Sequence, residues 1–561
     1  MDAAQYQYRK SVLAGLLILL NSNRQVLQLP FTPYLLTRSL SFTGLTTTKR
    51  DLSTSGGKGQ RSVTLEDVKA LPAGVPIIVP GRVRNNLVEP IPFSQIPGPK
   101  GWPVIGTLFE YFKPGGFRFN KMFEAYEARA KEYGPIYREQ IGPIVTVVIS
   151  DPEEYNKVLR NESKYPHRIE LEPLKYYRRS HGMGLGVVNS QGLDWYKQRT
   201  ILSKKMLRPP EVILFCDHMD EVADDFLNRL SAVRAKDGSM PDMEHEIFKW
   251  AFESIGTFLF EDRIGCYDTP PSELANQFII NLLGFFKLMQ PLMYNMPFYK
   301  IYPTKKWREF STYFGKLIDI GQELVDKKYD RLINNKNPSD ERTGFLEYIL
   351  SQKELTRREA NLSAIEMMTG GVETTSNSVL WTLLCLAQNP RVQDRLYRES
   401  QAVLKGGSHI DSKNIQQMNY VKACLKEALR LYPITFATSR ILHENLEVGG
   451  YDIPAGVQVQ ANLYCMGRDP EIFPSPLEYR PERWMKEGAK DCKAPALSNL
   501  VWGHGARMCL GRRLAEQEMY ILITKLNQKF RLEYHGEPPE PVLNTVMTPD
   551  RPLNLKFIPR Q

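Results

Sequence analysis

The stretch HGARMCLGRR (His504–Arg513) contains a cysteine whose neighbours can stabilise an anionic sulfur atom. Cys509 follows Arg507 closely and lies between Gly505 and Gly511. The apolar residues after it recur at helical spacing, so Cys509 comes at or just before the N-terminus of a predicted helix, where free backbone N–H groups and the helix dipole favour a thiolate. Arg507 adds positive charge, and the two glycines allow a bulky cofactor to approach closely. The pattern predicts a socket for a metal-bound thiolate.

The other cysteines argue against a disulfide or a zinc site at Cys509. They are widely scattered, with no CxxC pair and no Cys/His group at zinc spacing. An odd and sparse cysteine count also indicates a reducing compartment. The ordinary alternative for an isolated cysteine is a small, buried apolar side chain. The six other cysteines are Cys216, Cys266, Cys385, Cys424, Cys465 and Cys492.

The composition is that of a folded protein with a basic N-terminal segment. Of the 561 residues, 42% are hydrophobic and 24% are charged, which permits a large core and excludes wholesale disorder. The net charge is +10, and residues 1–61 contribute much of the excess, with eight basic residues against two acidic ones. Since no dense basic patch is interleaved with aromatic residues, we expect no nucleic-acid partner.

Residues 1–61 have the pattern of a targeting segment. The apolar run Val12–Leu20 is too short to span a bilayer, which needs about twenty residues. Arginines recur after it and Ser/Thr-rich sequence follows, which favours a mitochondrial transit peptide over a secretory signal peptide. Residues 62–95 are predicted to be a connector, and no transmembrane helix is expected downstream.

The remaining pattern predicts a mainly α-helical fold with small β-sheets (α+β). The Gly/Pro-rich stretch IPGPKGWPVIG predicts a stiff turn at the start of the folded body. Val145–Ile149 is the expected strand, and Asp151 is the expected N-cap of the helix that follows. Helical periodicity runs from Thr356 to Gln388, much longer than the usual helix. No second boundary follows, so residues 96–561 are predicted to form a single large domain.

The pattern W-x-x-G-x-R-x-C-x-G, from Trp502 to Gly511, resembles the haem-binding loop of the cytochrome P450 monooxygenases. The family usually has phenylalanine at the position of Trp502, often preceded by proline where this chain has Val501. Both replacements keep an apolar residue. The resemblance implies a P450 fold that binds haem b, with Cys509 as the axial ligand of the iron and Arg507, Gly505 and Gly511 around the cofactor.

Two further motifs match a structural cluster of the same family. KEALR contains Glu427 and Arg430, which lie three apart on one helical face, and YRPERW contains Arg483. The ordinary alternative is a pair of surface ion pairs, each contributing well under about 1 kcal/mol. The resemblance implies instead that the three side chains form a buried Glu-Arg-Arg cluster on the haem side of the core.

A third motif and a single arginine match the family's propionate-binding residues. DWYKQR supplies Trp195 and Arg199, one helical turn apart, and Arg440 follows Arg430 by ten residues. The resemblance implies that Trp195 and Arg199 bind a haem propionate and that Arg440 provides a second propionate contact. Arginine suits this role because its bonds to carboxylates are charge-assisted and often bidentate.

The stretch MMTGGVETTSNSVLW lies inside the long predicted helix and carries the residues expected to handle protons. Its two adjacent glycines cost about 1 kcal/mol each relative to alanine, which a helix that only packs would not favour. The ordinary alternative is close helix packing, with a threonine hydroxyl bonded back to a carbonyl. The resemblance implies that Glu373 and Thr374 form the family's acid–threonine pair for oxygen activation, in a helix locally opened over the iron. The family also uses aspartate at the position of Glu373.

Basic residues on one predicted face suggest the electron donor. Lys422 and Lys426 are four apart, and Arg512 and Arg513 follow the haem loop. A solvated face is the ordinary alternative. The resemblance to the mitochondrial class implies that such lysines dock an acidic 2Fe-2S ferredoxin of the adrenodoxin type, reduced by an NADPH-dependent reductase, and a basic rim steers an acidic partner.

The segment Phe285–Trp307 is rich in methionine and aromatic residues and ends in two lysines. It fits a core segment, a pocket lining or a shallow membrane-dipping loop, and the flanking charge suits an anionic interface. Together the resemblances imply a peripheral enzyme on the matrix side of the inner mitochondrial membrane, which oxidises a lipophilic, sterol- or steroid-like substrate with O2. The alternatives are a haem-thiolate isomerase or synthase that needs no electron donor, and a non-catalytic haem-binding sensor.

Overall fold

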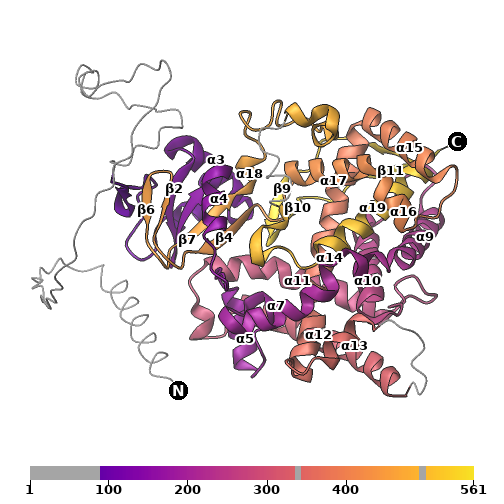
Figure 1. Cartoon of the computed structure of the whole chain (residues 1–561), viewed down its shortest axis with the longest axis horizontal. Helices are drawn as coiled ribbons and strands as arrows, with labels where there is room; N and C mark the ends of the chain where they lie inside the picture. Colours follow the sequence, from indigo (N-terminus) through magenta and orange to yellow (C-terminus); the bar gives the residue numbers. More distant parts are fainter. Residues whose placement is uncertain (1–88, 335–342, 492–500, 561) are drawn as a thin grey trace, which may run out of the picture. The chain divides into compact units, whose positions relative to one another are not determined.

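The computed structural model describes residues 89–334, 343–491 and 501–560. Pro90–Gln561 form one compact unit (Figure 1). The predicted transit peptide and most of the predicted connector lie outside the described residues. The unit begins ahead of the expected start at residue 96, because strand β1 (Ile91–Pro92) pairs in parallel with β6 (Tyr451–Ile453).

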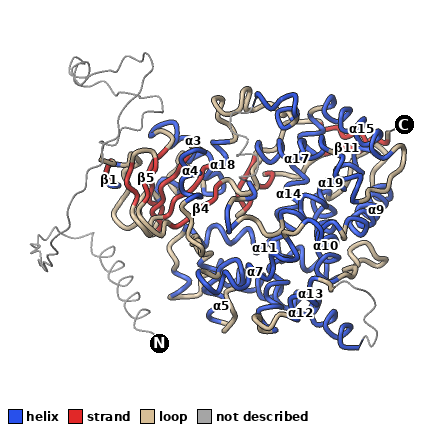
Figure 2. Tube along the Cα trace, viewed as in Figure 1, coloured by secondary structure: helices blue, strands red, loops and turns tan. Residues whose placement is uncertain are grey.

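Helices make up most of the unit, and small sheets and connecting loops make up the rest, which confirms the predicted fold class (Figure 2). No described helix is both long and apolar enough to cross a bilayer. The helices are α3 (Met122–Tyr133), α4 (Pro152–Arg160), α5 (Glu172–Ser180), α6 (Gly186–Asn189), α7 (Gly192–Met206), α8 (Pro209–Ile213), α9 (Cys216–Val233), α10 (Met243–Phe260), α11 (Glu273–Tyr294), α12 (Lys305–Asn334), α13 (Phe345–Ser351), α14 (Arg357–Gln388), α15 (Pro390–Leu404), α16 (Ser412–Gln417), α17 (Asn419–Leu431), α18 (Leu463–Met466) and α19 (Arg512–Lys529).

The strands form four small sheets, of which the largest has the order β2-β3-β7-β4. In it β2 and β3 are antiparallel, β3 and β7 are parallel, and β7 and β4 are antiparallel. Figure 1 shows this sheet with α3, α4 and α18 beside it, to one side of the helical part of the unit. The other strands are β2 (Ile136–Ile141), β3 (Ile144–Ile149), β4 (Ala437–Ile441), β5 (Leu446–Val448), β7 (Gln458–Asn462), β8 (Phe530–Tyr534), β9 (Pro541–Asn544), β10 (Val546–Pro549) and β11 (Leu555–Pro559).

The elements predicted from periodicity and capping form as expected. The strand expected at Val145–Ile149 is β3, one residue longer at its start. The Asp151 side chain accepts hydrogen bonds from the backbone N–H groups of Glu153 (2.7 Å) and Glu154 (3.2 Å), which are free at a helix N-terminus. The long predicted helix is α14, which begins after a capping box made by Thr356.

Helix α14 runs through the helical part, where it packs against α10, α12 and α17 and also contacts α19 (Figure 1). It is buried along most of its length, consistent with apolar residues on every side of its C-terminal half. Since α19 begins directly after the loop that carries Cys509, the packing of α19 against α14 fixes the distance between that loop and the middle of α14.

Candidate active site

Cys509 lies at the end of the loop that precedes α19, as its sequence context predicted. Its backbone N–H donates to the carbonyl oxygen of Trp502 (2.7 Å), which closes the loop. Of the cysteines in the described part of the chain, Cys509 alone is exposed, and the surface it exposes lines two cavities of about 220 and 290 Å³. Both cavities are also lined by Thr374 of α14. The sulfur therefore faces an interior space with the middle of α14 on its wall.

The surroundings of Cys509 act on its thiol in two directions. Its depth in the protein raises the pKa of the Cys509 thiol, whereas the backbone N–H of Gly511 and the charges of Arg199 and Arg512 favour the thiolate. A cation bound at the sulfur overrides the desolvation because it deprotonates a coordinating thiol. The cavities beside the sulfur leave room for such a cation.

Arg507 is held firmly but keeps part of its guanidinium free. Its Nε donates to the carbonyl of Pro166 (2.9 Å), and its Nη2 donates to the carbonyl of Ser190 (3.0 Å) and to Oε1 of Gln191 (2.7 Å). The guanidinium lies 3.9 Å from the ring centroid of Trp195. Its Nη1 is buried and has no hydrogen-bond partner among the described residues. An anion in the cavity would satisfy that atom.

Two further arginines lie at these cavities. Arg199 lines the smaller cavity and donates from Nη2 to the carbonyl of Met508 (2.7 Å), which ties α7 to the cysteine loop. Arg168 lines both cavities and donates from Nη2 to the carbonyl of Val188 (3.0 Å). The sequence alone did not indicate Arg168, because it belongs to no motif and lies in an irregular segment.

Crowding of these arginines makes the cavity electropositive. Burial, together with Arg168, Arg440 and Arg199, lowers the pKa of Arg507 to about 8. Burial lowers the pKa of Arg199 to about 10, with Cys509 acting in the opposite direction. A guanidinium does not release its proton in a folded protein, so the repulsion instead favours the binding of an anionic group.

Arg440 lies on β4, next to the cysteine loop. Its guanidinium pairs with Glu162 and donates to the carbonyl of His504 (2.7 Å), and it lines neither of the two cavities that Cys509 lines. It pairs with Glu162 and ties β4 to the loop, and its charge also acts on Arg507. Gly505 adopts a φ of +69°, and a Cβ there would collide with the Glu162 carboxylate, which explains its glycine.

The backbone and packing constraints that explain glycine at position 505 do not apply at Gly511. A Cβ at Gly511 would meet no protein atom within 4 Å, and the residue lines the smaller cavity. Packing within the protein therefore does not require a glycine at this position. The space beside it fits the expectation that a bulky group approaches the backbone here.

Glu373 and Thr374 lie on α14 but on different faces. Thr374 lines both cavities, and its Oγ1 donates to the carbonyl of Gly370 (2.8 Å). Glu373 is buried, lines neither of these cavities, and accepts a hydrogen bond at Oε1 from Nδ2 of Asn377 (3.3 Å), while its Oε2 has no described partner. Burial raises the pKa of Glu373 to about 8. Helix α14 is continuous here, so the expected local opening is absent from the described structure.

A buried carboxyl group that lines the smaller cavity was not expected from the sequence. Glu518 of α19 lines the smaller cavity and accepts hydrogen bonds from Ser254 of α10 (2.5 Å) and Thr375 of α14 (3.2 Å). Burial raises the pKa of Glu518 to about 8. Its position at helical spacing in an apolar face was the available signal, since a charged residue there is costly unless it is paired.

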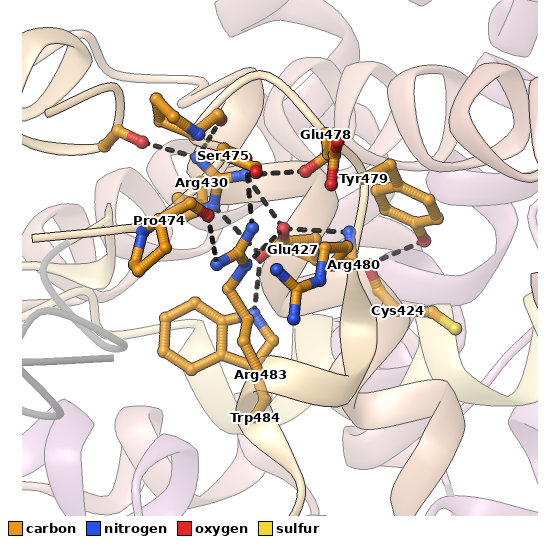
Figure 3. A network of polar contacts seen from close by, with 12 residues as sticks. Cys424, Glu427, Arg430, Pro474, Ser475, Glu478, Tyr479, Arg480, Arg483 and Trp484 are labelled. Atoms are coloured by element: carbon orange, nitrogen blue, oxygen red, sulfur yellow. Dashed lines mark hydrogen bonds and ion pairs between the residues drawn. The ribbon is translucent and has the colours of Figure 1, made fainter. Parts of the chain in front are cut away.

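Glu427, Arg430 and Arg483 come together in one buried network, as the resemblance implied (Figure 3). Arg430 donates to both oxygens of Glu427, from Nε (2.9 Å) and Nη2 (2.8 Å), and Arg483 donates from Nε to Oε1 (2.8 Å). Trp484 Nε1 and the backbone N–H of Arg480 also donate to Glu427. The network joins α17 to the segment 467–484.

The four predicted partner-binding residues lie on α17 and α19, which pack together. Lys422 and Lys426 are half-buried rather than fully exposed, and burial lowers the pKa of each. Glu516 and Arg512 both influence Lys426, and Arg512 donates to Glu516 (3.0 Å). Arg513 is exposed.

The donor set fits a haem. No group of three or more His, Cys, Asp or Glu side chains in the described part of the chain could hold a metal ion, so Cys509 would supply a single protein ligand. The unpartnered Nη1 of Arg507, with Arg168 and Arg199 nearby, suits the carboxylates of an anionic porphyrin. The thiolate position at a helix N-terminus suits the iron.

Known proteins resemble this chain along most of its length. The family model described as Cytochrome P450 matches residues 96–557. Cytochrome P450 10 of Lymnaea stagnalis is 48% identical over 529 residues, which cover 92% of this chain and 96% of that protein. The mitochondrial 1,25-dihydroxyvitamin D(3) 24-hydroxylase of Mus musculus is 31% identical over 510 residues (90% and 96%). The mitochondrial sterol 26-hydroxylase of Homo sapiens is 31% identical over 481 residues (82% and 88%).

Proposed function

The chain belongs to the cytochrome P450 family, with relatives in its mitochondrial class, and is a monooxygenase of that family; we propose that it inserts one oxygen atom from O2 into a sterol- or steroid-like lipid, with electrons from a 2Fe-2S ferredoxin. The observation that carries the proposal is the position of Cys509. Its sulfur faces cavities whose walls combine Thr374 with Arg168 and Arg507. No other described cysteine faces these cavities.

The residues that line the cavities have different roles in the proposed reaction. Haem, when bound through Cys509, supplies the oxidising power, and a thiolate ligand favours O–O cleavage. Arg168, Arg199 and Arg507 bind and orient the propionates. Thr374 holds a hydroxyl at the cavity and can donate or accept a hydrogen bond there once it releases the Gly370 carbonyl.

Glu373 suits a proton carrier. Because the pKa of Glu373 is raised to about 8, the carboxyl group can both hold and release a proton near neutral pH. Its Oε2 has no described partner, so rotation of the side chain breaks only the hydrogen bond from Asn377. We assign Glu373 the supply of protons to the Thr374 hydroxyl.

The proposed electron donor is an acidic ferredoxin of the adrenodoxin type with its NADPH reductase. Lys422, Lys426, Arg512 and Arg513 lie on two helices that pack together, and α19 starts at the Cys509 loop. A basic rim at that place steers an acidic partner toward the haem edge. Two relatives carry "mitochondrial" in their names, which agrees with such a donor.

Exposed apolar side chains support a peripheral position on the matrix side of the inner mitochondrial membrane. Phe298, Ile301 and Tyr302, in the predicted membrane-dipping segment, are 47%, 50% and 66% exposed. A second group consists of Trp102, Val104, Phe109 and Phe112. Phe119 connects the two regions by packing against Phe112 and Tyr294. Apolar exposure of this kind suits insertion into a bilayer surface.

A reconstituted system tests the proposal. The reduced holoenzyme should give the carbon monoxide difference spectrum of a thiolate-ligated haem, and Cys509→Ala should abolish it. Product should form from a sterol only when ferredoxin, ferredoxin reductase and NADPH are all present. Turnover that needs no electron donor would contradict the monooxygenase mechanism, and turnover with a flavoprotein reductase alone would contradict the ferredoxin.

A further inference from the structure

A third cavity, of about 260 Å³, lies next to the Cys509 site. Thr435 lines both this cavity and the larger of the two that Cys509 lines, so the two spaces meet at that residue. Its apolar lining includes Ile144, Met293 and Phe436. We call it the sheet cavity, because one wall is the inner face of the sheet β2-β3-β7-β4.

The inner face of that sheet carries an unexpected row of polar side chains. Glu139 of β2 pairs in register with Thr146 of β3, and Thr146 pairs with Gln458 of β7, so the three side chains project from the same face. All three line the sheet cavity, and so does Gln460, two residues beyond Gln458. The buried face of such a sheet is usually apolar, so the row needs an explanation.

Glu139 keeps one acceptor atom without a partner. The side chain is only 2% exposed, and its Oε1 accepts a hydrogen bond from Thr107 (2.7 Å) with Arg129 at 3.8 Å. Its Oε2 is buried and has no hydrogen-bond partner among the described residues. Leaving a buried acceptor unpaired costs about 1–3 kcal/mol. Burial raises the pKa of Glu139, whereas Thr107 and Arg129 favour its charged form.

Gln460, on the same cavity wall, already has its amide oxygen in hydrogen bonds. Its Oε1 accepts hydrogen bonds from Gln458 (3.3 Å) and from the hydroxyl of Tyr126 (3.5 Å). The two donors, Gln458 and Tyr126, line the sheet cavity as well. Among the side chains that line the sheet cavity, the buried atom without a described partner is an acceptor, Oε2 of Glu139, so the matching group on a ligand is a donor such as an alcohol.

We propose that the sheet cavity binds the lipid substrate and that Glu139 recognises a hydroxyl group on the end of the lipid remote from the oxidised carbon. The inference rests on the proposed function, because it assumes that a lipid enters from this side of the Cys509 site. The substrate class is then a hydroxylated lipid rather than a ketone or a hydrocarbon. Glu139 is a specificity-determining residue and takes no part in the oxidation.

Substrate binding to the ferric holoenzyme, followed as a shift of the Soret band, tests the inference. The probes are cholesterol, cholestenone and cholestene, which carry a hydroxyl, a ketone and no oxygen at the same ring position. We expect cholesterol to bind at least about tenfold more tightly than either analogue, because only the hydroxyl satisfies Oε2 of Glu139. Equal affinity for all three would overturn the inference. This comparison needs no variant.

Glu139→Gln sharpens the test, since it keeps the size of the side chain. Thr107 continues to donate to Oε1, so the new Nε2 takes the place of Oε2 and presents a donor to the cavity. We expect the preference to change from cholesterol to cholestenone by about tenfold. Glu132→Gln is the matched control, because Glu132 contacts the same Arg129 (3.8 Å) but is 58% exposed. An unchanged preference in Glu139→Gln would overturn the inference.

The same experiment separates the inference from the proposed function. If cholesterol binds selectively but no product forms with ferredoxin, the electron donor is wrong and the recognition of the hydroxyl stands. If the carbon monoxide spectrum shows a thiolate-ligated haem but none of the three lipids shifts the Soret band, the sterol-like substrate class falls together with the inference. If turnover occurs with equal affinities, only the inference falls.

Discussion

Two buried clusters of arginine and glutamate differ in how completely their hydrogen bonds are used. In the network around Glu427, Arg430 makes five hydrogen bonds, one for each of its N–H donors (Figure 3). Around Cys509, Arg507 uses Nε and Nη2 and leaves Nη1 without a described partner. The first cluster is complete within the protein, whereas the second leaves a buried donor without a partner among the described residues.

The difference gives a rule for telling structural charges from ligand-binding ones in this fold. Both clusters are buried, and both include an arginine that touches backbone carbonyls, so burial and charge alone do not separate them. The separating features are an unpartnered buried atom and a cavity beside it. Like Arg507, Glu139 and Glu373 each have one buried polar atom without a described hydrogen-bond partner. Glu139 also lines a cavity.

The largest effect is expected from breaking the complete cluster. Glu427→Ala leaves Arg430 and Arg483 buried without their carboxylate, which should lower the free energy of unfolding by about 3–5 kcal/mol. Denaturant unfolding followed by circular dichroism measures the loss. Glu478→Gln is the control, because only the backbone carbonyl of Glu478 joins the network, and it should change stability by less than about 0.5 kcal/mol. A stable Glu427→Ala variant would refute the structural role.

A smaller effect is expected at Glu373, which lacks the arginines that Glu427 has. The pKa of Glu373 is raised from 4.5 to about 8 in the folded protein, so the folded state holds one more proton than the unfolded state between these values. Stability from this group is therefore present below about pH 4.5 and falls as the pH rises toward 8, by about 1.4 kcal/mol per unit.

Glu373→Gln removes this slope. Between about pH 5.5 and about pH 7.5, we expect the variant to gain about 2.7 kcal/mol relative to the natural protein in urea unfolding. The infrared band of a protonated carboxyl group, present in the natural protein near neutral pH, should weaken in the variant. Glu347→Gln, at an exposed position, should leave both readouts unchanged. Parallel pH profiles for the natural protein and Glu373→Gln would contradict the raised pKa.

These contrasts also show which parts of the site were predictable from the sequence. Helices α14 and α19 and the cap at Asp151 follow from local periodicity and local hydrogen bonds, so the sequence predicted them nearly to the residue. Cys509 and the Glu427 cluster follow from motifs. These features depend on residues close in sequence or on family spacing.

The misses depend on tertiary placement. Glu162, from a distant irregular segment, pairs with Arg440, and no motif indicates this pairing. Arg168 reaches the cavity although no motif surrounds it. Glu139 alternates with Arg138 in a strand, and only the packing of the sheet decides which of the two faces inward.

Removing a charge from the arginines around Cys509 should change the rate of haem loss more than the free energy of unfolding. Arg199→Gln takes away one arginine of the cavity, so we expect haem to leave about tenfold faster, which corresponds to about 1.4 kcal/mol. Transfer of haem to apomyoglobin measures this rate. Unfolding of the haem-free protein should change less, because Arg199 makes one described hydrogen bond within the protein.

Lys197→Gln provides the matched control for Arg199→Gln. Lys197 lies on the same helix and carries the same charge, but it is exposed and lines neither cavity at Cys509. Its rate of haem loss should equal that of the natural protein. Equal rates for all three proteins would show that Arg199 serves only the loop, through Met508.

The smallest effect is expected for the basic side chains on the α17–α19 surface. These charges belong neither to the network around Glu427 nor to the cavities at Cys509. Lys426→Gln should raise the KM for ferredoxin about threefold at low salt without changing kcat, because a rim charge acts mainly on association. Glu516 and Arg512 lie close enough to influence Lys426, so part of its charge is already balanced and the effect stays modest. Raising the salt concentration should remove the difference, since screening acts on exposed charges first. Lys413→Gln, on the neighbouring helix α16, is the control; an equal KM change in that variant would show that net charge rather than the α17–α19 surface attracts the ferredoxin.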